Sequence, residues 1–248
     1  MKALLRWLLL VIVAAAALQV FFIARIALMA TVDPQSTSFQ RSEAFRITAQ
    51  KGQLRWRQQW VPYDQISDHL KRAVIASEDG AFASHDGVDW EAVEKAWQRN
   101  SKAEEQAARR EAARAQQAAR PNARPPKIVG GSTITQQLAK NILLSGERTL
   151  LRKGQEFVLT FALEKMLSKE RILEIYLNSV EWGEGVFGAE AAARHYYRKS
   201  AAQLSPYEAA RLAVMLPRPK YFEKVPNSGY LASRASTIAA RMRDAELP

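Results

Sequence analysis

The most apolar stretch of the chain lies close to its N-terminus. The segment WLLLVIVAAAALQVFFIA, residues 7–24, has eighteen positions without a charged side chain. Because an α-helix rises about 1.5 Å per residue, this segment spans most of a hydrocarbon core of roughly 30 Å. We predict a transmembrane anchor within residues 1–30. A cleaved signal peptide ending near Ala27 and Ala30 is the alternative, but the apolar region of such peptides is usually only about 7 to 15 residues long.

Basic residues flank the apolar segment on both sides. Lys2 and Arg6 precede it, which favours a cytoplasmic N-terminus, although Arg25 and Arg41 behind it reduce the asymmetry. The remainder of the chain is therefore predicted to lie outside the cytoplasm.

The segment after the anchor, residues 31–55, is mostly polar and contains a proline break at Pro34. It has no apolar period long enough to form a core, so we expect a stalk. Within this segment, FRITA, residues 45–49, has the composition of an extended strand. Helix-like patterns begin at Trp56, and residues 56–248 are predicted to form the main domain.

Amphipathic helical patterns dominate this domain. SDHLKRAVIASED repeats apolar residues at the i, i+3, i+4, i+7 spacing of a helix, with Ser67 or Asp68 as N-cap, and it delivers Glu78 at its end. Four later segments carry an apolar face, namely TITQQLAKNILL, RKGQEFVLTFALEKML, SKERILEIYLN and SPYEAARLAVML. Ser168 and Ser205 stand at N-cap positions. The fold class is therefore predicted as mainly α.

A low-complexity segment interrupts the pattern at residues 100–127. NSKAEEQAARREAARAQQAARPNARPPK contains no large apolar residue, but its Ala, Gln, Glu and Arg content favours a helix. We predict a solvated helical arm that ends at Pro121, Pro125 and Pro126. The arm is rich in basic residues. It is either an insertion without function or a segment that contacts anionic lipid.

The charge balance narrows the class of partner. The chain has 36 Lys and Arg residues against 25 Asp and Glu, a net charge of +11, which predicts an anionic partner. An outward-facing domain is a poor candidate for nucleic-acid binding, so a lipid headgroup or a diphosphate is the better prediction. The absence of cysteine excludes disulfides and thiol catalysis. The histidines, His69, His85 and His195, lack zinc-type spacing, so no metal site is predicted.

Proton-transfer groups concentrate in IASEDGAFASHDG, residues 75–87. Glu78, Asp79 and His85 surround one large apolar side chain, Phe82. Carboxylate and imidazole groups are the common general acids and bases of enzymes. This segment is therefore a candidate catalytic motif.

Anion-binding features lie in GGSTITQQLAKN, residues 130–141. Two glycines allow close backbone approach, and Ser132 or Thr133 caps the following helix, with Thr133 and Gln136 in capping-box spacing. Free amides at a helix N-terminus attract phosphate. Ser132, Gln136 and Lys140 share one helix face, which predicts an anion site. An ordinary capped amphipathic helix is the alternative.

A third candidate region is RKGQEFVLTFALEK. Arg152 and Glu156 lie one helical turn apart in it, and their spacing alone favours a surface ion pair of about 0.3 to 0.5 kcal/mol. Glu164 is the other candidate acid, about two turns beyond Glu156. His195, which lies beside two tyrosines, is predicted to pack rather than to catalyse.

Five segments, taken in chain order, resemble the motifs of one protein family. They are EDGAFASHDG, GGSTITQQLAKN, RKGQEFVLTFALE, KERILEIYLNSVEWGEGVFGAEAAA and LSPYEAARLAVMLPRP. The chain resembles the peptidoglycan glycosyltransferases, specifically their monofunctional, membrane-anchored members, over roughly residues 62–219. The resemblance implies a lysozyme-like, mainly α fold with two lobes, of which the smaller is partly embedded in the membrane. It also implies a single-pass protein of the cell inner membrane with a periplasmic catalytic domain.

The resemblance also implies an activity. Enzymes of this family polymerise lipid II into β-1,4-linked glycan strands, with inversion at the donor C1 and release of undecaprenyl diphosphate. Glu78 would be the general base that activates the acceptor hydroxyl. Asp79, Phe82 and His85 would support it, by positioning the carboxylate and limiting water.

The second catalytic carboxylate of the family matches Glu156 rather than Glu164. It would act near the donor diphosphate, either as an acid or as an organiser of cations. The residues that would line the donor site are Ser132, Thr133, Gln137, Lys140, Asn141 and Arg152. Lys140 and Arg152 would balance the charge of the diphosphate.

The implied partners are lipid II, a lipid-linked glycan strand, the membrane with its anionic lipid, and cell-wall synthesis or division proteins. No cofactor is required by the pattern, although a Mg²⁺ or Mn²⁺ ion could accompany the substrate diphosphate. Transpeptidase activity is not expected, because S-x-x-K and K-T-G are absent. Two features depart from the family pattern, the long basic arm at residues 100–127 and the short LPRP form of the last motif.

Two other functions fit the same elements. A hydrolytic or lytic enzyme of lysozyme-like architecture would cut glycan, but it has no need for an anion site or a retained anchor. A membrane-bound scaffold for division or elongation proteins would need no catalytic carboxylate.

Overall fold

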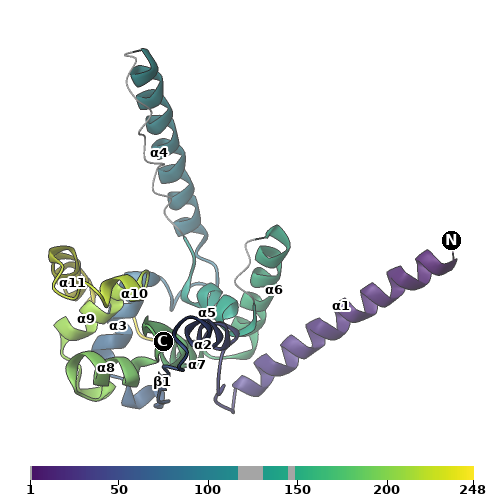
Figure 1. Ribbon diagram of the computed structural model, residues 1–248, viewed down its shortest axis with the longest axis horizontal. Helices are drawn as coiled ribbons and strands as arrows, with labels where there is room; N and C mark the ends of the chain where they lie inside the picture. Colours follow the sequence, from purple (N-terminus) through teal and green to yellow (C-terminus); the bar gives the residue numbers. More distant parts are fainter. Residues whose placement is uncertain (1, 117–130, 145–148) are drawn as a thin grey trace.

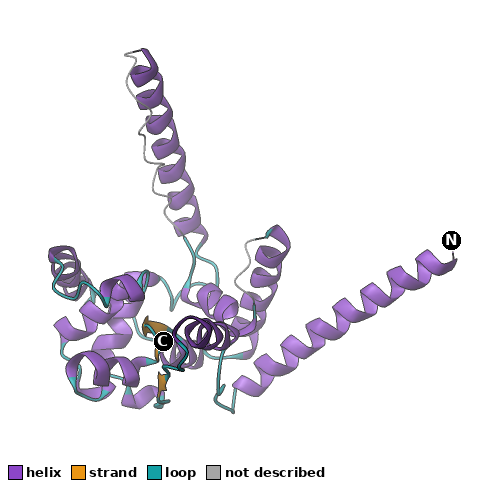
Figure 2. Cartoon of the chain, viewed as in Figure 1, coloured by secondary structure: helices purple, strands orange, loops and turns teal. Residues whose placement is uncertain are grey.

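The computed structural model describes residues 2–116, 131–144 and 149–248 (Figure 1). Most of these residues are helical (Figure 2). The helices are α1 Lys2–Met29, α2 Ser38–Lys51, α3 Asp68–Glu78, α4 Trp90–Gln116, α5 Ile134–Leu143, α6 Leu150–Met166, α7 Lys169–Ser179, α8 Ala189–Tyr197, α9 Pro206–Met215, α10 Pro219–Phe222 and α11 Gly229–Arg241. The strands are β1 Arg57–Gln58, β2 Glu181–Gly183 and β3 Val186–Phe187, and short 3-10 turns lie at η1 Tyr63–Gln65 and η2 Ala201–Gln203. The predicted mainly α fold is confirmed.

Helix α1 is long and apolar enough, by length and composition, to cross a membrane. It projects away from the rest of the molecule (Figure 1). Side chains such as Leu4 and Trp7 near its start are exposed, as in a lipid-facing helix. At its other end, Phe22, Ile26 and Met29 are buried in the domain core. The predicted N-terminal apolar helix is confirmed, and it ends packed against the domain.

Much of the segment predicted as a stalk is helix α2, and the prediction of an extended FRITA strand is wrong. Thr37 and Gln40 form a capping box at its start, and Gly52 ends the helix with a left-handed φ of 68°. Ile47 of this helix is fully buried, and the bounds of the stalk at residues 31–55 stay a prediction. The Gln40 amide donates to the Ser179 carbonyl at 3.0 Å. Capping and docking thus override the strand preference of the β-branched residues.

A contiguous hydrophobic core joins the remaining helices. Helix α3 packs against α9 and α11, while α5 packs against α6, α7 and α2. Figure 1 shows α3, α9 and α11 on one side of the domain and α5 and α6 on the other. Trp182, Tyr176 and Phe82 are the largest fully buried side chains. The predicted start of the main domain at residue 56 stays a prediction.

A small sheet in the order β1-β3-β2 lies beside this core, with β1 parallel and β2 antiparallel to β3. Two glycines of the fourth motif shape its turns. A Cβ atom on Gly185 would lie 2.2 Å from the Arg55 carbonyl oxygen, and one on Gly188 would lie 2.7 Å from the Asn178 carbonyl oxygen. Both glycines have positive φ, 73° and 85°. Both positions therefore require glycine, which tolerates a positive φ and allows the backbone to approach closely.

Helix α4 extends far from the domain (Figure 1). It begins at Trp90 and continues to Gln116, which confirms the predicted helical arm over residues 100–116. The predicted end of the arm at its prolines lies outside the described residues. Trp90 and Trp97 are exposed near the base of the helix.

Serine and threonine N-caps begin several of these helices, as predicted. Ser67 caps α3, Thr133 caps α5, Ser168 caps α7 and Ser205 caps α9. Each side chain accepts a hydrogen bond from the backbone amide three residues later, which satisfies an otherwise unpaired donor. The caps of α3 and α5 matter most for function, because these two helices meet at the candidate site.

Candidate active site

Glu78 is the last residue of helix α3 and lies at the edge of a pocket. Helix α3 buries Val74 and Ile75 in the core, which fixes the direction in which its end points. The Gln137 amide donates to a Glu78 carboxylate oxygen at 3.0 Å, and the Tyr176 hydroxyl donates to the Gln137 carbonyl oxygen at 3.1 Å. Tyr176 is almost completely buried. Two hydrogen bonds in series, from Tyr176 in the core through Gln137, therefore fix the Glu78 carboxylate in place.

Burial raises the pKa of the Glu78 carboxyl above its usual value, because the charged form loses solvation. The hydrogen bond from Gln137 opposes this rise in pKa, the charge of Asp79 adds to it, and the charge of Lys140 opposes it. A carboxylate with a raised pKa accepts a proton more readily at neutral pH. Glu78 and Lys140 lie within electrostatic reach of each other, so the first and second motifs face one site.

Asp79 joins the first motif to the start of helix α5. One of its carboxylate oxygens lies 2.9 Å from His85 Nε2, and the other accepts a hydrogen bond of 2.9 Å from the Ile134 amide. The Gly87 amide donates to His85 Nδ1 at 3.1 Å. Because Nδ1 accepts, the ring proton belongs on Nε2, where it is donated to Asp79. These contacts of Asp79 and His85 fix the loop after Glu78, and their supporting role in catalysis stays a prediction.

Phe82 belongs to this loop, and its side chain is fully buried. Its ring packs edge-on against His85 at a centroid distance of 6.4 Å, and the Lys169 ammonium lies 4.6 Å from its centroid. Lys169 also donates to the His85 carbonyl oxygen at 2.6 Å. The side chain of Phe82 is absent from the pocket lining, so its contacts fit a support for the loop rather than a cover over the site.

Helix α5 places its polar residues differently from the predicted stripe. Thr133 and Gln136 form the capping box, and Gln136 is only 2% exposed, so it does not belong to an open face. Gln137 takes its place and contacts Glu78. Thr133 also donates to the Gly87 carbonyl oxygen at 2.6 Å, which ties the two motifs together. The face towards Glu78 therefore carries Gln137 and Lys140, because the capping box uses Gln136.

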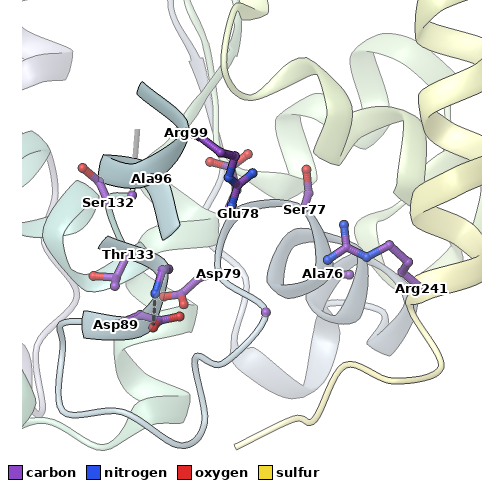
Figure 3. A pocket seen from close by; sticks show the side chains of 13 residues that line it. Ala76, Ser77, Glu78, Asp79, Asp89, Ala96, Arg99, Ser132, Thr133 and Arg241 are labelled. Atoms are coloured by element: carbon purple, nitrogen blue, oxygen red, sulfur yellow. Dashed lines mark hydrogen bonds between the residues drawn. The ribbon is translucent and has the colours of Figure 1, made fainter. Parts of the chain in front are cut away.

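A pocket of about 300 Å³ opens beside Glu78 (Figure 3). Its walls come from the end of α3, the base of α4, the segment before α5 and the end of α11. Ser132 and Thr133 line one side. Figure 3 shows Arg99 reaching over Glu78 from α4 and Arg241 pointing in from α11 beside Ser77. The volume is at the lower end of the range for small-molecule sites.

Glu156 and Arg152 form a second cluster on helix α6. Arg152 Nη1 lies 3.2 Å from Glu156, and Lys153 also pairs with that carboxylate. Glu156 is only 3% exposed, so the alternative of a surface ion pair is wrong. The Arg152 Nε atom is buried and has no hydrogen-bond partner among the described residues. A buried donor without a partner can bind an anion at little extra desolvation cost.

The other candidate side chains have structural contacts. Glu164 accepts hydrogen bonds from Thr135 at 2.5 Å and Lys169 at 2.8 Å, so it ties α5 and α7 to α6. His195 lies 2.9 Å from Arg57 and packs on its neighbouring tyrosine, in keeping with a packing role. Within residues 2–116, 131–144 and 149–248, no group of three or more His, Asp or Glu side chains could hold a metal ion.

A sequence profile of the family described as Transglycosylase matches residues 46–243. The chain belongs to the transglycosylase family. Two similar relatives are each named biosynthetic peptidoglycan transglycosylase. The protein from Burkholderia orbicola (strain MC0-3) is 50% identical over 232 residues, covering 94% of this chain and 86% of the relative. The protein from Bordetella pertussis (strain Tohama I) is 52% identical over 216 residues, covering 87% and 82%.

This transglycosylase is an enzyme, a glycosyltransferase. The predicted site residues of this transglycosylase form two separate clusters. Glu78, Asp79, Ser132 and Thr133 share the pocket, and Gln137 contacts Glu78. The cluster of Arg152 and Glu156 does not line that pocket. Asn141 lies half-buried on the last turns of α5, one residue after Lys140.

Two cationic residues of the transglycosylase pocket, Arg99 and Arg241, were not predicted from the sequence. Arg99 opens the basic arm and Arg241 lies in the last turn of α11, and neither stands in a motif. Their sequence context is that of solvated arginines on exposed helix faces. Only the fold brings them to the same pocket as Glu78, so no local signal could have identified them.

Proposed function

We propose that this transglycosylase polymerises lipid II into β-1,4-linked glycan strands, with inversion at the donor C1 and release of undecaprenyl diphosphate. The observation that carries the proposal is the Glu78 carboxylate, which has a raised pKa. Gln137 holds this carboxylate at the edge of a sugar-sized pocket. The relatives, by their names, act on peptidoglycan. A base at this position suits the activation of a sugar hydroxyl.

In the proposed step, Glu78 removes the proton from the 4-hydroxyl of the acceptor sugar. The hydroxyl oxygen forms a bond to the donor C1, and the bond from C1 to the diphosphate oxygen breaks. The electron pair of that bond leaves with the diphosphate, whose developing charge is balanced by Lys140 and Arg152. Ser132, Thr133 and Asn141 would complete the donor site.

We propose Glu156 as an organiser of cations rather than a proton donor. Its carboxylate accepts contacts from both Arg152 and Lys153, and it is buried. These contacts hold Arg152 in place, so that its buried Nε atom remains available to the diphosphate. A Mg²⁺ or Mn²⁺ ion that travels with the substrate would be held mainly by the diphosphate itself.

We propose that α1 anchors the enzyme in the inner membrane with the N-terminus in the cytoplasm and the catalytic domain in the periplasm. The basic residues Lys2 and Arg6 support this orientation. Cell-wall synthesis or division proteins are proposed as further partners. A transpeptidase activity is not part of the proposal.

The function is tested by incubating the purified enzyme with lipid II and, separately, with finished peptidoglycan. We expect glycan polymers from lipid II and no fragments from the polymer. Fragments released from finished peptidoglycan, together with no growth from lipid II, would mean that the enzyme cuts glycan instead. Retention of the anomeric configuration in the product would reject the inverting step.

The rate of polymerisation is expected to rise with pH through an apparent pKa above the value of about 4.3 for an ordinary glutamate. The reason is that Glu78 must be ionised to accept a proton and that burial raises its pKa. The measurement is kcat/KM for lipid II from acidic to neutral pH. A rate that is already constant at and above the ordinary glutamate pKa would contradict this assignment.

The basic arm is proposed to contact anionic lipid. Helix α4, which includes the described part of the arm, exposes Trp90 and Trp97 near its base, carries Arg99 and Lys102, and extends away from the domain (Figure 1). Each basic residue near an anionic surface contributes about 1 kcal/mol. We expect trypsin to cleave the arm more slowly in vesicles with anionic lipid than in zwitterionic vesicles, while deletion of residues 101–124 leaves turnover of a water-soluble substrate nearly unchanged. Equal cleavage rates in the two vesicles would favour an inert insertion.

A further inference from the structure

A pair of glutamine side chains joins helix α1, the candidate membrane span, to helix α6, which carries Arg152 and Glu156. Gln19 Nε2 donates to Gln155 Oε1 at 2.8 Å, and Gln155 Nε2 donates back to Gln19 Oε1 at 2.9 Å. Each amide thus serves as both donor and acceptor for the other. Gln19 is the polar interruption in the uncharged segment at residues 7–24.

The position of Gln19 places this pair within the depth of a bilayer that α1 would span. Gln19 lies six residues before Arg25, which corresponds to about 9 Å along a helix. Arg25 is the first charged residue after the apolar segment and marks the level where α1 leaves hydrocarbon. Unpaired amides in hydrocarbon are costly, so the two glutamines stabilise each other's position.

The rest of the contact shows that α1 is fixed to the domain. Phe22, Ile26 and Met29 lie on the same helix face as Gln19, and all three are buried. Arg171 Nε donates to the Met29 carbonyl oxygen at 2.8 Å. The anchor therefore has a defined register against the catalytic domain, which a flexible tether would lack.

Helix α6 carries the donor-site cluster in the same turn as Gln155. Arg152 precedes Gln155 by three residues, and Glu156 follows it directly. The first turn of α6 also exposes Leu150 and Leu151 almost completely, at 91% and 89%. Such side chains suit contact with acyl chains, which agrees with a membrane depth for this turn.

We propose that Gln19 and Gln155 are positioning residues, which hold Arg152 and Glu156 at the depth of the diphosphate of a membrane-bound donor. The inference rests on the proposed function, because it assumes a lipid-linked donor. The pair touches neither substrate nor reacting atoms and acts through the placement of α6. Because the pair sets the depth of α6 in the membrane, we expect the KM for a donor with a long lipid chain to depend on it. The KM for a water-soluble donor should not.

The test uses the full-length enzyme in vesicles and the variants Gln19→Leu, Gln155→Leu and the double variant. The donor is lipid II with its full chain or a short-chain, water-soluble analogue with the same headgroup. We expect each single variant to raise KM for the long-chain donor by about threefold to twentyfold, with little change in kcat. The short-chain donor should show no change. The double variant should resemble the single ones, because both lose one shared interaction.

A matched control is Leu18→Ala, which changes a neighbouring lipid-facing side chain that is 50% exposed. It should leave KM for both donors unchanged. Equal losses with both donors would mean that the pair serves only folding, and unchanged KM in both single variants would remove the pair from any positioning role. If the unaltered enzyme fails to polymerise lipid II, the proposed function fails instead, so the two failures are distinguishable.

Discussion

Replacement of Glu78 by glutamine is expected to reduce polymerisation of lipid II by about 10²- to 10⁴-fold, the usual contribution of a general base. Glutamine keeps the size of the side chain and can still accept the hydrogen bond from Gln137, but it cannot take the proton of the acceptor hydroxyl. The measurement is the initial rate of glycan formation from lipid II, with membrane association and helical content checked in the same preparation.

Glu78→Gln is not expected to destabilise the enzyme at neutral pH. The raised pKa of Glu78 means that the folded state binds a proton more tightly than the unfolded state. The stabilisation from this proton is present below the unfolded pKa and is lost as pH rises through the folded pKa, so the ionised carboxylate destabilises the enzyme at neutral pH. Glu78→Gln removes that charge. Its thermal unfolding temperature at neutral pH should therefore equal or exceed that of the unaltered enzyme.

A matched control for Glu78→Gln is Glu170→Gln, the same chemical change at an exposed position on α7. This control should retain full polymerisation. Near-normal activity of Glu78→Gln, or an equal loss in both variants, would remove Glu78 from its role as the base. An inactive but more stable Glu78 variant is the pattern expected of a functional site that is not optimised for stability.

Replacement of Arg152 by alanine is expected to reduce kcat/KM for the lipid-linked donor by about 10²- to 10³-fold, the usual effect of removing one donor that stabilises developing negative charge. Stability should fall by about 1 to 3 kcal/mol, because the buried Glu156 carboxylate loses one partner but keeps Lys153. Arg152→Lys should recover part of the activity, since lysine restores the charge but not the planar fork. The measurements are steady-state kinetics and denaturant unfolding.

Helix α8 offers the control for this experiment. Arg194 pairs with the buried Glu190 at 2.8 Å and at the same spacing of four residues, with the order of the two residues reversed. Arg194→Ala should lower stability and leave polymerisation intact, because none of the predicted site residues lies on α8. If Arg152→Ala behaves in the same way as this control, then Arg152 holds the fold together and does not serve the donor.

The sequence predicted the helices best where a local signal and the apolar period agree. Ser67 and Thr133 were identified as candidate caps because the chemistry of an N-cap lies within four residues. The proposed role of Glu78 rests on the resemblance of its motif, because nothing in the spacing distinguishes it from Asp79. Burial and the contact with Gln137 later gave a physical reason for that choice.

The features that the sequence did not predict share one physical cause, which is the burial of polar side chains. Helix α2 was missed because it docks partly through a buried glutamine, Gln40, and the apolar period gives no signal for such a contact. The spacing of residues 132, 136 and 140 predicts an open face for Gln136, but its side chain is buried in the capping box with Thr133. The contact of Gln19 could not be predicted from the apolar segment around it, because its partner Gln155 is 136 positions away.

The most direct test of the proposed chemistry is a structure of the enzyme with a stable analogue of the lipid-linked diphosphate donor and a sugar acceptor. We expect the acceptor 4-hydroxyl within about 3 Å of the Glu78 carboxylate. The diphosphate should lie against Lys140 and the unpaired Nε atom of Arg152. An analogue bound with its diphosphate away from both cations, or with no sugar hydroxyl near Glu78, would contradict the proposed roles.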